Sequence, residues 1–279
     1  MAILYEDNNM KSPRYLKWLA DTGERLTSAD GKEIEIWEFQ YQNDNIVLSE
    51  WAIHFRNHYC LDSEIDILRS GTGKTRKQYL LDRKFPDEKE KPGPSIRSGD
   101  FGEILIADYL EFICNYWVPR WRYIDRIIRN ESKKGSDIFG FKIIKSENFS
   151  PDDEMIIFEV KASLSDTKAN RLQDAINASN IDEIRKGETL NALKQKFLDG
   201  KDMQNVKKIE RFQCIADNAF IEKSGAAAVL EKSVYNKTDL NTTITSGHYN
   251  QDCLSLIVIR GENMMPLVHE LYRRAVDET

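Results

Sequence analysis

Short segments in which hydrophobic and polar residues alternate predict the strands of the fold. Residues 32–41 (KEIEIWEFQY) combine β-branched and aromatic residues with charged ones in near alternation, which is typical of a half-buried strand. Residues 137–144 and 155–162 are two further β-type runs, and the Ser, Asn, Pro and Asp residues between them predict a hairpin turn. Residues 253–260 (CLSLIVIR) are apolar enough to form a buried strand.

Longer apolar segments predict helices around these strands. We expect helices over residues 48–59 and 100–117, a largely helical segment over 167–212, a small-residue helix over 225–232 and a closing helix over 264–276. The order helix, hairpin, helices, strand, helix predicts an α/β (α+β) fold in which helices flank a mixed central sheet.

A segment rich in charge, glycine and proline divides the chain. Residues 69–99 include the stretch KFPDEKEKPGPSIRSG, a composition typical of a mobile or draped connection. We therefore expect an N-terminal α+β region with a basic linker over residues 1–92, and a core over residues 93–279.

Charge and cysteine content narrow the classes of function. The chain has 40 basic and 46 acidic residues, and its net charge of −6 does not by itself indicate a nucleic-acid-binding protein. Basic residues nevertheless concentrate in residues 119–134 and 185–211, where they could contact phosphates. The four cysteines lie far apart, which argues against a zinc–cysteine site and a disulfide framework.

No apolar run approaches the roughly 20 residues that span a bilayer, and residues 1–9 do not resemble a signal peptide, so we expect a cytoplasmic protein without a membrane partner.

Two carboxylates and a lysine are expected to converge at the predicted hairpin. Side chains alternate between the faces of a strand, so Glu159 and Lys161 point the same way, whereas their apolar neighbours point into the core. The hairpin can bring Asp137 next to Glu159, and Gly135 would allow a tight turn into the first strand. This pattern is typical of metal-dependent nucleases of the PD-(D/E)xK type, which have a restriction-endonuclease-like core.

The residue types account for the expected chemistry. The carboxylates of Asp137 and Glu159, with the Val160 carbonyl as a candidate third ligand, suit Mg²⁺ or Mn²⁺. Such a metal lowers the pKa of bound water and stabilises charge on the phosphodiester. Lys161 would orient that water or, with a depressed pKa, help to deprotonate it.

Glu103 is a fourth candidate for the catalytic set. Gly102 and Glu103 are predicted to lie in the first turn of the helix before the hairpin, where a carboxylate could face the same metal. Asp100 and Glu103 also stand at capping-box spacing, which alone would explain the glutamate. Both interpretations stay open on the sequence.

Basic and polar residues around the hairpin are candidates for contacts with the phosphate backbone. They are Arg129, Lys133, Lys134, Arg171 and Gln173. Phosphate contacts give affinity without sequence choice, so we expect little or no sequence specificity.

His54 and His58 share a helical face at i, i+4 spacing and are a candidate metal pair. The sequence shows no carboxylate or cysteine partner for them. Surface or core histidines are therefore the favoured interpretation.

Four segments together resemble the HamA family, in the expected order: residues 91–111, 135–142, 158–163 and 256–275. The similarity extends from about Trp37 to the C-terminus. The resemblance implies a PD-(D/E)xK-type nuclease core that acts as the smaller subunit of the Hachiman anti-phage system, restrained by a HamB-like helicase partner until it engages DNA. It also implies a catalytic set of Glu103, Asp137, Glu159 and Lys161, with Ser136 in place of the proline of the motif.

Two other functions are compatible with the same residues. One is a non-catalytic adaptor that presents DNA or a partner, although the complete acid–acid–lysine set argues against it. The other is an RNase or toxin, because an ExK site does not distinguish DNA from RNA.

Overall fold

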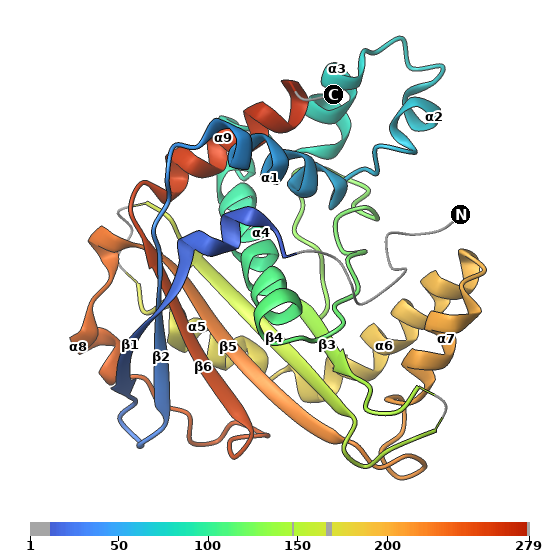
Figure 1. The fold of residues 1–279 in the computed structure, drawn as a ribbon. Coiled ribbons are helices and arrows are strands. Elements are labelled where there is room, and N and C mark those ends of the chain that lie inside the picture. The colour runs from blue at the N-terminus through green and yellow to red at the C-terminus, as the bar shows by residue number, and fades with distance from the viewer. Residues whose placement is uncertain (1–11, 147, 166–168, 278–279) are drawn as a thin grey trace.

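Strands that are far apart in the sequence lie side by side in one sheet. The structure is a computed structural model that describes residues 12–146, 148–165 and 169–277. Its strands are β1 (Leu19–Thr27), β2 (Glu33–Phe39), β3 (Ile138–Lys142), β4 (Glu154–Ser163), β5 (Ile221–Glu231) and β6 (Leu254–Gly261). Within the described residues they form a six-stranded sheet in the order β1-β2-β6-β5-β4-β3 (Figure 1). The four central strands β2, β6, β5 and β4 are parallel, and β1 and β3 run antiparallel to them at the two edges.

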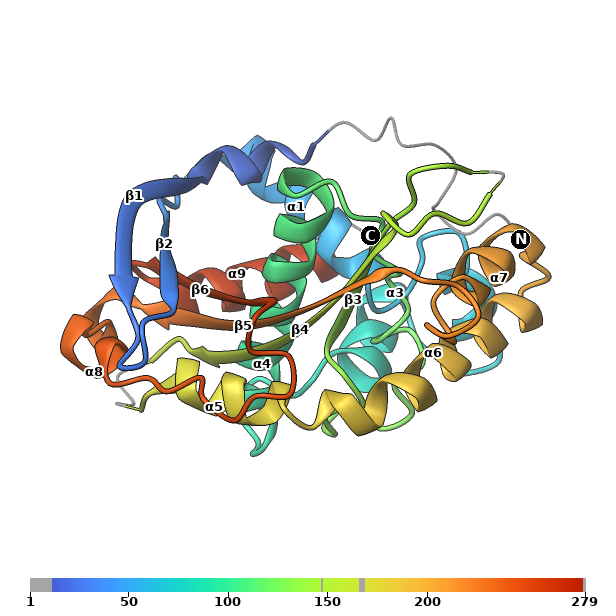
Figure 2. The same cartoon turned by 90° about the horizontal axis from the view of Figure 1, so that it is seen from below.

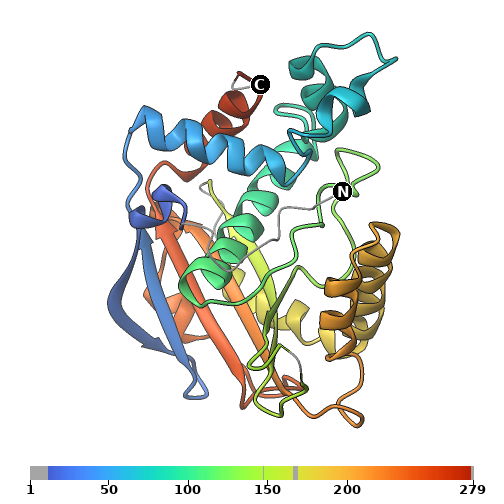
Figure 3. The same ribbon diagram turned by 45° about the vertical axis from the view of Figure 1, so that its right-hand side comes forward.

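Helices cover both faces of the sheet. On one face, α1 (Asn45–Asn57), α4 (Gly93–Asp108) and α9 (Met264–Asp277) share a core cluster with Phe158 and Val160. In Figure 3 the green helix α4 crosses in front of the sheet. On the other face, α5 (Arg171–Ser179) packs on β5 and β6, and α6 (Asp182–Asp199) and α7 (Met203–Glu210) pack on β3 and β4 (Figure 2). The short helices are α2 (Ile65–Arg69), α3 (Arg76–Tyr79) and α8 (Lys237–Asn241).

Side-chain periodicity explains why these segments adopt their structures. In α1 the apolar residues recur at helical spacing, and the N-cap Asp44 accepts hydrogen bonds from the amides of Ile46 and Val47. In β4 successive apolar residues enter different clusters, because Ile157 packs with α6 and Phe158 packs with α4. Most predicted elements are confirmed: residues 32–41 contain β2, residues 137–162 form the β3–β4 hairpin, residues 253–260 contain β6, and helices occupy 48–57, most of the described part of 167–212, and 264–276. This arrangement confirms the α/β class and is compatible with a restriction-endonuclease-like core.

The predicted helix over residues 225–232 is wrong, because this segment is the central strand β5. Its glycine and alanines favour a helix by local propensity, but here they fill a strand that is covered on both faces. A Cβ at Gly225 would lie only 2.2 Å from the ring of Phe158 on the neighbouring strand. The small residues therefore reflect close packing around β5.

The segment 69–99, predicted as a mobile or draped connection, contains regular structure and contributes to the core. It contains α3, a π-helical turn over Leu80–Lys84 and the beginning of α4. Leu80 and Phe85 are buried in the cluster that also holds α1 and α9. The division of the chain after residue 92 stays a prediction, although both parts contribute to one sheet and one core cluster.

Two sequence predictions concern the whole chain. All four cysteines are free thiols, as expected. In the described part of the chain, no helix combines the length and the apolar character needed to cross a bilayer.

Candidate active site

Strand β4 extends beyond its neighbour β3, and this leaves an open strand edge. β3 pairs with β4 only as far as Ile138↔Phe158, whereas the pairing of β4 with β5 continues to Ser163. From Glu159 onward, no strand of the described chain pairs with this edge of β4. Asp137 directly precedes β3, so it lies where the edge opens.

Asp137 is held at the open edge by two contacts. Its Oδ2 accepts a hydrogen bond from the Val160 amide at 3.1 Å, and its Oδ1 lies 2.6 Å from Nη2 of Arg122. Gly135 has a φ of +98° and makes the expected turn into β3. The N–H and C=O of one strand residue point to the same side, so the Val160 carbonyl faces the edge that Asp137 occupies.

Glu159 and Lys161 share one face of β4, as the alternation predicted. Lys161 Nζ lies 2.7 Å from Glu159 Oε1. Glu159 is only 5% exposed, and its Oε2 has no hydrogen-bond partner among the described residues. A buried carboxylate oxygen is costly unless a donor or a cation joins it.

Glu103 reaches the same region from helix α4. Gly102 permits the close approach of this helix to β4. A Cβ at that position would lie only 3.2 Å from the Cβ of Ala162, which is closer than ordinary van der Waals contact. The Tyr123 hydroxyl donates to Glu103 Oε2 at 2.6 Å, and Arg122 Nε lies 2.8 Å from the same oxygen. Arg122 therefore connects Glu103 to Asp137.

The capping-box interpretation of Glu103 is wrong. Helix α4 begins at Gly93, so Asp100 and Glu103 lie in its interior and not in its first turn. Asp100 instead forms a buried two-point ion pair with Arg126, with both distances at 2.6 Å. Glu103 thus has no capping role that would explain it.

Burial raises the pKa of both glutamates. The pKa of Glu159 is raised to about 8 by burial and by the charge on Asp137, while Lys161 acts in the opposite direction. The pKa of Glu103 is raised to about 7 by burial, with Arg122 opposing and Asp137 adding to the shift. Carboxylates crowded in a desolvated place favour either protons or a bound cation.

Lys161 keeps its proton in this setting. Burial lowers the pKa of Lys161, but the charges on Glu159 and Asp137 outweigh it, and the net pKa is raised. Of the two expected roles, orientation of a water molecule with neutralisation of phosphate charge uses this protonated form, and both roles stay predictions.

Sequence reasoning missed Asp182, a further buried carboxylate near Asp137. It begins α6, is 1% exposed, and its Oδ1 accepts a hydrogen bond from the Ser136 hydroxyl at 2.7 Å. Burial raises its pKa to about 6, with Ser136 opposing and Asp137 adding to the shift. An acidic residue at the start of a helix is ordinary, and nothing in the sequence indicated that this one lies beside the hairpin.

The donor set of the site fits a hard divalent cation. Asp137, Glu159 and Glu103 provide carboxylate oxygens, and the Val160 carbonyl lies at the same edge. Oxygen ligands of this kind suit Mg²⁺ and Mn²⁺. The buried Oε2 of Glu159, which has no hydrogen-bond partner among the described residues, is an oxygen that such a cation would satisfy.

The arginines of the basic segment 119–134 mainly face inward. Arg122 pairs with Glu103 and Asp137, and Arg126 pairs with Asp100. Arg129, a predicted DNA contact, lies 2.9 Å from an oxygen of Asp87 and donates to the backbone carbonyls of Leu81 and Phe85. The sequence treated this segment as a surface patch, but it mostly neutralises acidic residues of the protein itself.

The segment also holds two lysines, Lys133 and Lys134, whose contact with DNA stays a prediction. Lys133 lines a hollow of about 250 Å³ beside Glu103, together with Ser95, Ile96, Gly99, Asp100, Arg122, Arg126 and Ser132. Lys134 is exposed.

On α5, Arg171 pairs with Asp174, and Gln173 exchanges hydrogen bonds with the backbone of Ile244. The partners of Arg171 and Gln173 do not belong to the carboxylate cluster, by which we mean Glu103, Asp137 and Glu159. Contact of Arg171 and Gln173 with DNA stays a prediction.

Comparison with known proteins identifies the family. The family model described as HamA matches residues 13–275, which is nearly the whole chain. No curated protein and no solved structure matches the chain. The chain therefore belongs to the HamA family, the family that its motifs resemble.

Proposed function

We propose that the protein is a nuclease that requires Mg²⁺ or Mn²⁺ and cleaves DNA as the effector subunit of a Hachiman complex. As a HamA-family member, the chain is a component of this anti-phage defence system. One observation supports the nuclease proposal above all. The buried Glu159, with its unpaired Oε2, lies at the open edge of β4 beside Asp137 and in contact with Lys161.

Each residue would have a distinct role in phosphodiester hydrolysis. Asp137 and Glu159 would hold the cation with the Val160 carbonyl, and Glu103 would face it directly or through water. When bound, the metal lowers the pKa of a water molecule and stabilises charge on the phosphate. The Lys161 ammonium would orient the attacking water and oppose the charge that develops on the phosphate.

DNA is the expected substrate, with little sequence specificity. Lys133 and Lys134 would contact phosphates, which carry no sequence information. With a net charge of −6 and most arginines of the 119–134 segment paired internally, the isolated chain should bind DNA weakly. Delivery by a helicase partner would compensate for this weak binding, and the family resemblance implies a HamB-like helicase that also restrains the nuclease.

A nuclease assay tests the proposal. The full chain, alone and with its helicase partner, would be incubated with linear DNA and matched RNA in Mg²⁺, Mn²⁺ or EDTA. We expect metal-dependent cleavage of DNA, and a loss of at least about 100-fold for Glu159→Gln. Glu188→Gln, which changes an exposed glutamate on α6, is the matched control and should keep the wild-type rate.

Each contrary result has a definite meaning. Wild-type cleavage by Glu159→Gln would show that the site is assigned wrongly. Faster cleavage of RNA than of DNA would indicate an RNase. Absence of cleavage in every state, with the partner and DNA ends present, would favour a non-catalytic adaptor.

A further inference from the structure

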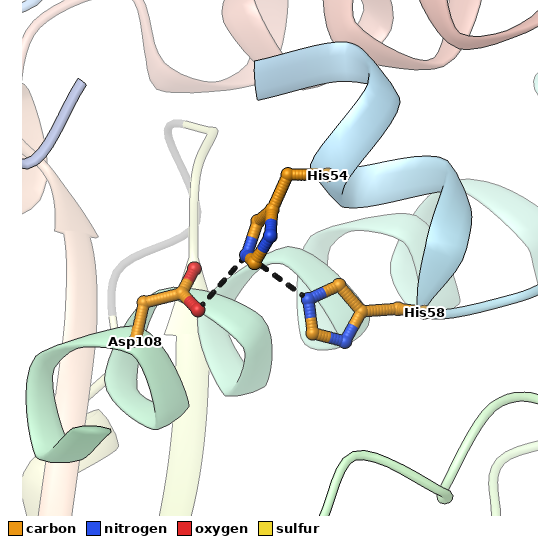
Figure 4. Close-up of side chains that lie close together, drawn as sticks. All are labelled: His54, His58 and Asp108. Carbon is orange, nitrogen blue, oxygen red and sulfur yellow. Dashed lines mark hydrogen bonds and ion pairs between the residues drawn. The ribbon is translucent and has the colours of Figure 1, made fainter. Parts of the chain in front are cut away.

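Two histidines and an aspartate converge on the face of the sheet that α1 and α4 cover. His54 lies on α1, His58 is the C-cap of that helix one turn later, and Asp108 is the last residue of α4 (Figure 4). One ligand atom from each of the three lies within 4.8 Å of the other two. The sequence suggested the histidine pair but gave no acidic partner, because Asp108 is 50 residues further along the chain and only the packing of α1 against α4 brings it close.

Two of the distances in this cluster match those between ligands on one metal ion. His54 Nε2 lies 3.1 Å from Asp108 Oδ1 and 3.3 Å from His58 Nε2. Nitrogen and oxygen ligands about 2.0–2.1 Å from a tetrahedral zinc ion are separated by about 3.3 Å from one another. Two of the three ligand pairs therefore stand at coordination spacing, and the third pair lies within 4.8 Å.

A single proton cannot satisfy this cluster well. If His54 Nε2 carries a proton and donates it to Asp108, the lone pair of His58 Nε2 receives at best a shared hydrogen bond. If His58 donates to His54 instead, the His54 lone pair faces a carboxylate oxygen. A cation in place of the proton would satisfy all three atoms together.

The surroundings fix these ligands in place. The Tyr15 hydroxyl donates to Asp108 Oδ2, and Arg120 Nη2 lies 2.8 Å from Oδ1. Arg120 also pairs with Glu111 at 2.5 Å, so a carboxylate balances its charge close to the cluster. The Tyr15 hydroxyl orients the aspartate, as outer contacts of metal ligands do, whereas Arg120 would share Oδ1 with a bound ion.

Burial differs among the three residues in a way that suits an ion with one open position. The Asp108 side chain is fully buried and His58 is 5% exposed, whereas the His54 side chain is 27% exposed. An ion held there would be enclosed by protein on the side of Asp108 and His58. It would remain accessible to a water molecule on the side of His54, as a fourth ligand.

We propose that His54, His58 and Asp108 form a second metal site, separate from the carboxylate cluster, that binds a first-row transition-metal ion, with Zn²⁺ as the expected occupant. Imidazole nitrogens favour Zn²⁺ over the hard cations that suit the oxygen-only site at β4. The ion would link the C-terminal end of α1 to the C-terminal end of α4. The site thus stabilises the contact between the first part of the chain and the core.

Metal content of the purified full chain tests the proposal. The protein would be stripped with a chelator, equilibrated with Zn²⁺ in excess Mg²⁺, freed of unbound ions and analysed for bound zinc. We expect one tightly held zinc per chain, and an affinity at least about 100-fold weaker in His54→Ala. His54 is partly exposed, so this variant should fold, which circular dichroism would verify.

Three comparisons make the outcome decisive. His269→Ala, a histidine on α9 outside the cluster, and Glu159→Gln, in the carboxylate site, should both keep the zinc. Co²⁺ in place of Zn²⁺ should give the visible absorption of a nitrogen-ligated tetrahedral ion in the wild type and not in His54→Ala. Absence of tight zinc in the wild type, equal binding by His54→Ala, or loss of zinc in Glu159→Gln would overturn the proposal.

Discussion

The Arg122 guanidinium lies 2.6 Å from Asp137 Oδ1, so a cation of the protein itself contacts a carboxylate that we propose as a metal ligand. The same side chain reaches Glu103 at 2.8 Å. Arg122 and a divalent ion would therefore compete for the charge of these acids, while Arg122 also stabilises the metal-free protein.

Replacement of Arg122 by Gln should have two opposite effects. Because two buried carboxylates lose their counter-charge, the metal-free variant should be less stable by about 3 kcal/mol. Its melting temperature should then rise more on addition of Mg²⁺ than that of the wild type, since the ion meets no competing cation. Thermal unfolding over a range of Mg²⁺ concentrations measures both effects. Arg83→Gln, at an exposed arginine, is the control, and an unchanged Mg²⁺ response in Arg122→Gln would contradict the competition.

Replacement of Lys161 by Met should separate catalysis from metal binding. Lys161 contacts Glu159 at 2.7 Å but offers no ligand to a metal, so loss of its charge should lower kcat by at least about 100-fold while metal binding is retained or strengthened. The Mg²⁺ dependence of cleavage and of the melting temperature gives the two quantities. Lys207→Met on α7 serves as control, and a variant that lost metal binding along with activity would argue for a structural role of the lysine.

The contribution of Glu159 and Glu103 to the stability of the metal-free protein should fall as the pH rises. Glu159 and Glu103 have pKa values raised from 4.5 to about 8 and about 7, so the folded state binds more protons than the unfolded state in this window. Their contribution is complete below about pH 4.5 and is lost by about pH 8. Melting temperatures in EDTA between these pH values should decline less steeply in Glu159→Gln than in the wild type and in Glu188→Gln. Parallel slopes in all three proteins would show that Glu159 ionises normally.

Asp182→Asn should stabilise the metal-free protein above pH 6. Burial raises the Asp182 pKa to about 6, so at higher pH the folded state must accommodate a buried charge that asparagine lacks. The amide oxygen can still accept the hydrogen bond from Ser136, and we expect a gain of about 1–3 kcal/mol at pH 8 that disappears below pH 5. Chemical denaturation at the two pH values measures it. A gain of equal size at low pH would point to packing as the cause and not to charge.

Arg129 and Lys134 should differ when each is replaced by Ala. Arg129 donates to two backbone carbonyls and pairs with Asp87, so its loss should destabilise the fold, by about 1–3 kcal/mol. Lys134 is exposed, so its loss should weaken DNA binding and reduce the salt dependence without changing stability. DNA binding at several salt concentrations, together with thermal unfolding, checks both. Equal DNA binding by Lys134→Ala and the wild type would show that this lysine does not contact DNA.

The hairpin and its acid–acid–lysine pattern could be predicted because residues close together in the sequence determine both. Strand alternation sets Glu159 and Lys161 on one face, and a turn of suitable composition returns the chain to Asp137. The residues around them could not be found this way. Arg122 and Asp182 come from other segments, and only the packing of those segments brings their side chains to the open edge.

Strand β5 shows the same limit in the backbone. A run of alanines after Gly225 has the propensity of a helix, and only the presence of strands on both sides makes it a strand. The helices and buried residues of the segment 69–99 were not predicted, for a related reason. Its charged composition is typical of a loop, yet the few apolar residues, such as Leu80 and Phe85, decide its structure because they are fully buried.

The position of β2 has a consequence for engineering the chain. β2 is hydrogen-bonded to β6 along Ile34↔Leu256 to Phe39↔Gly261, although the two strands are separated by most of the sequence. A shortened version that began at residue 93 would uncover one entire edge of β6 with its row of unsatisfied amides and carbonyls. Exposed edges of this kind recruit strands from other molecules, so such a fragment should aggregate when it is expressed on its own.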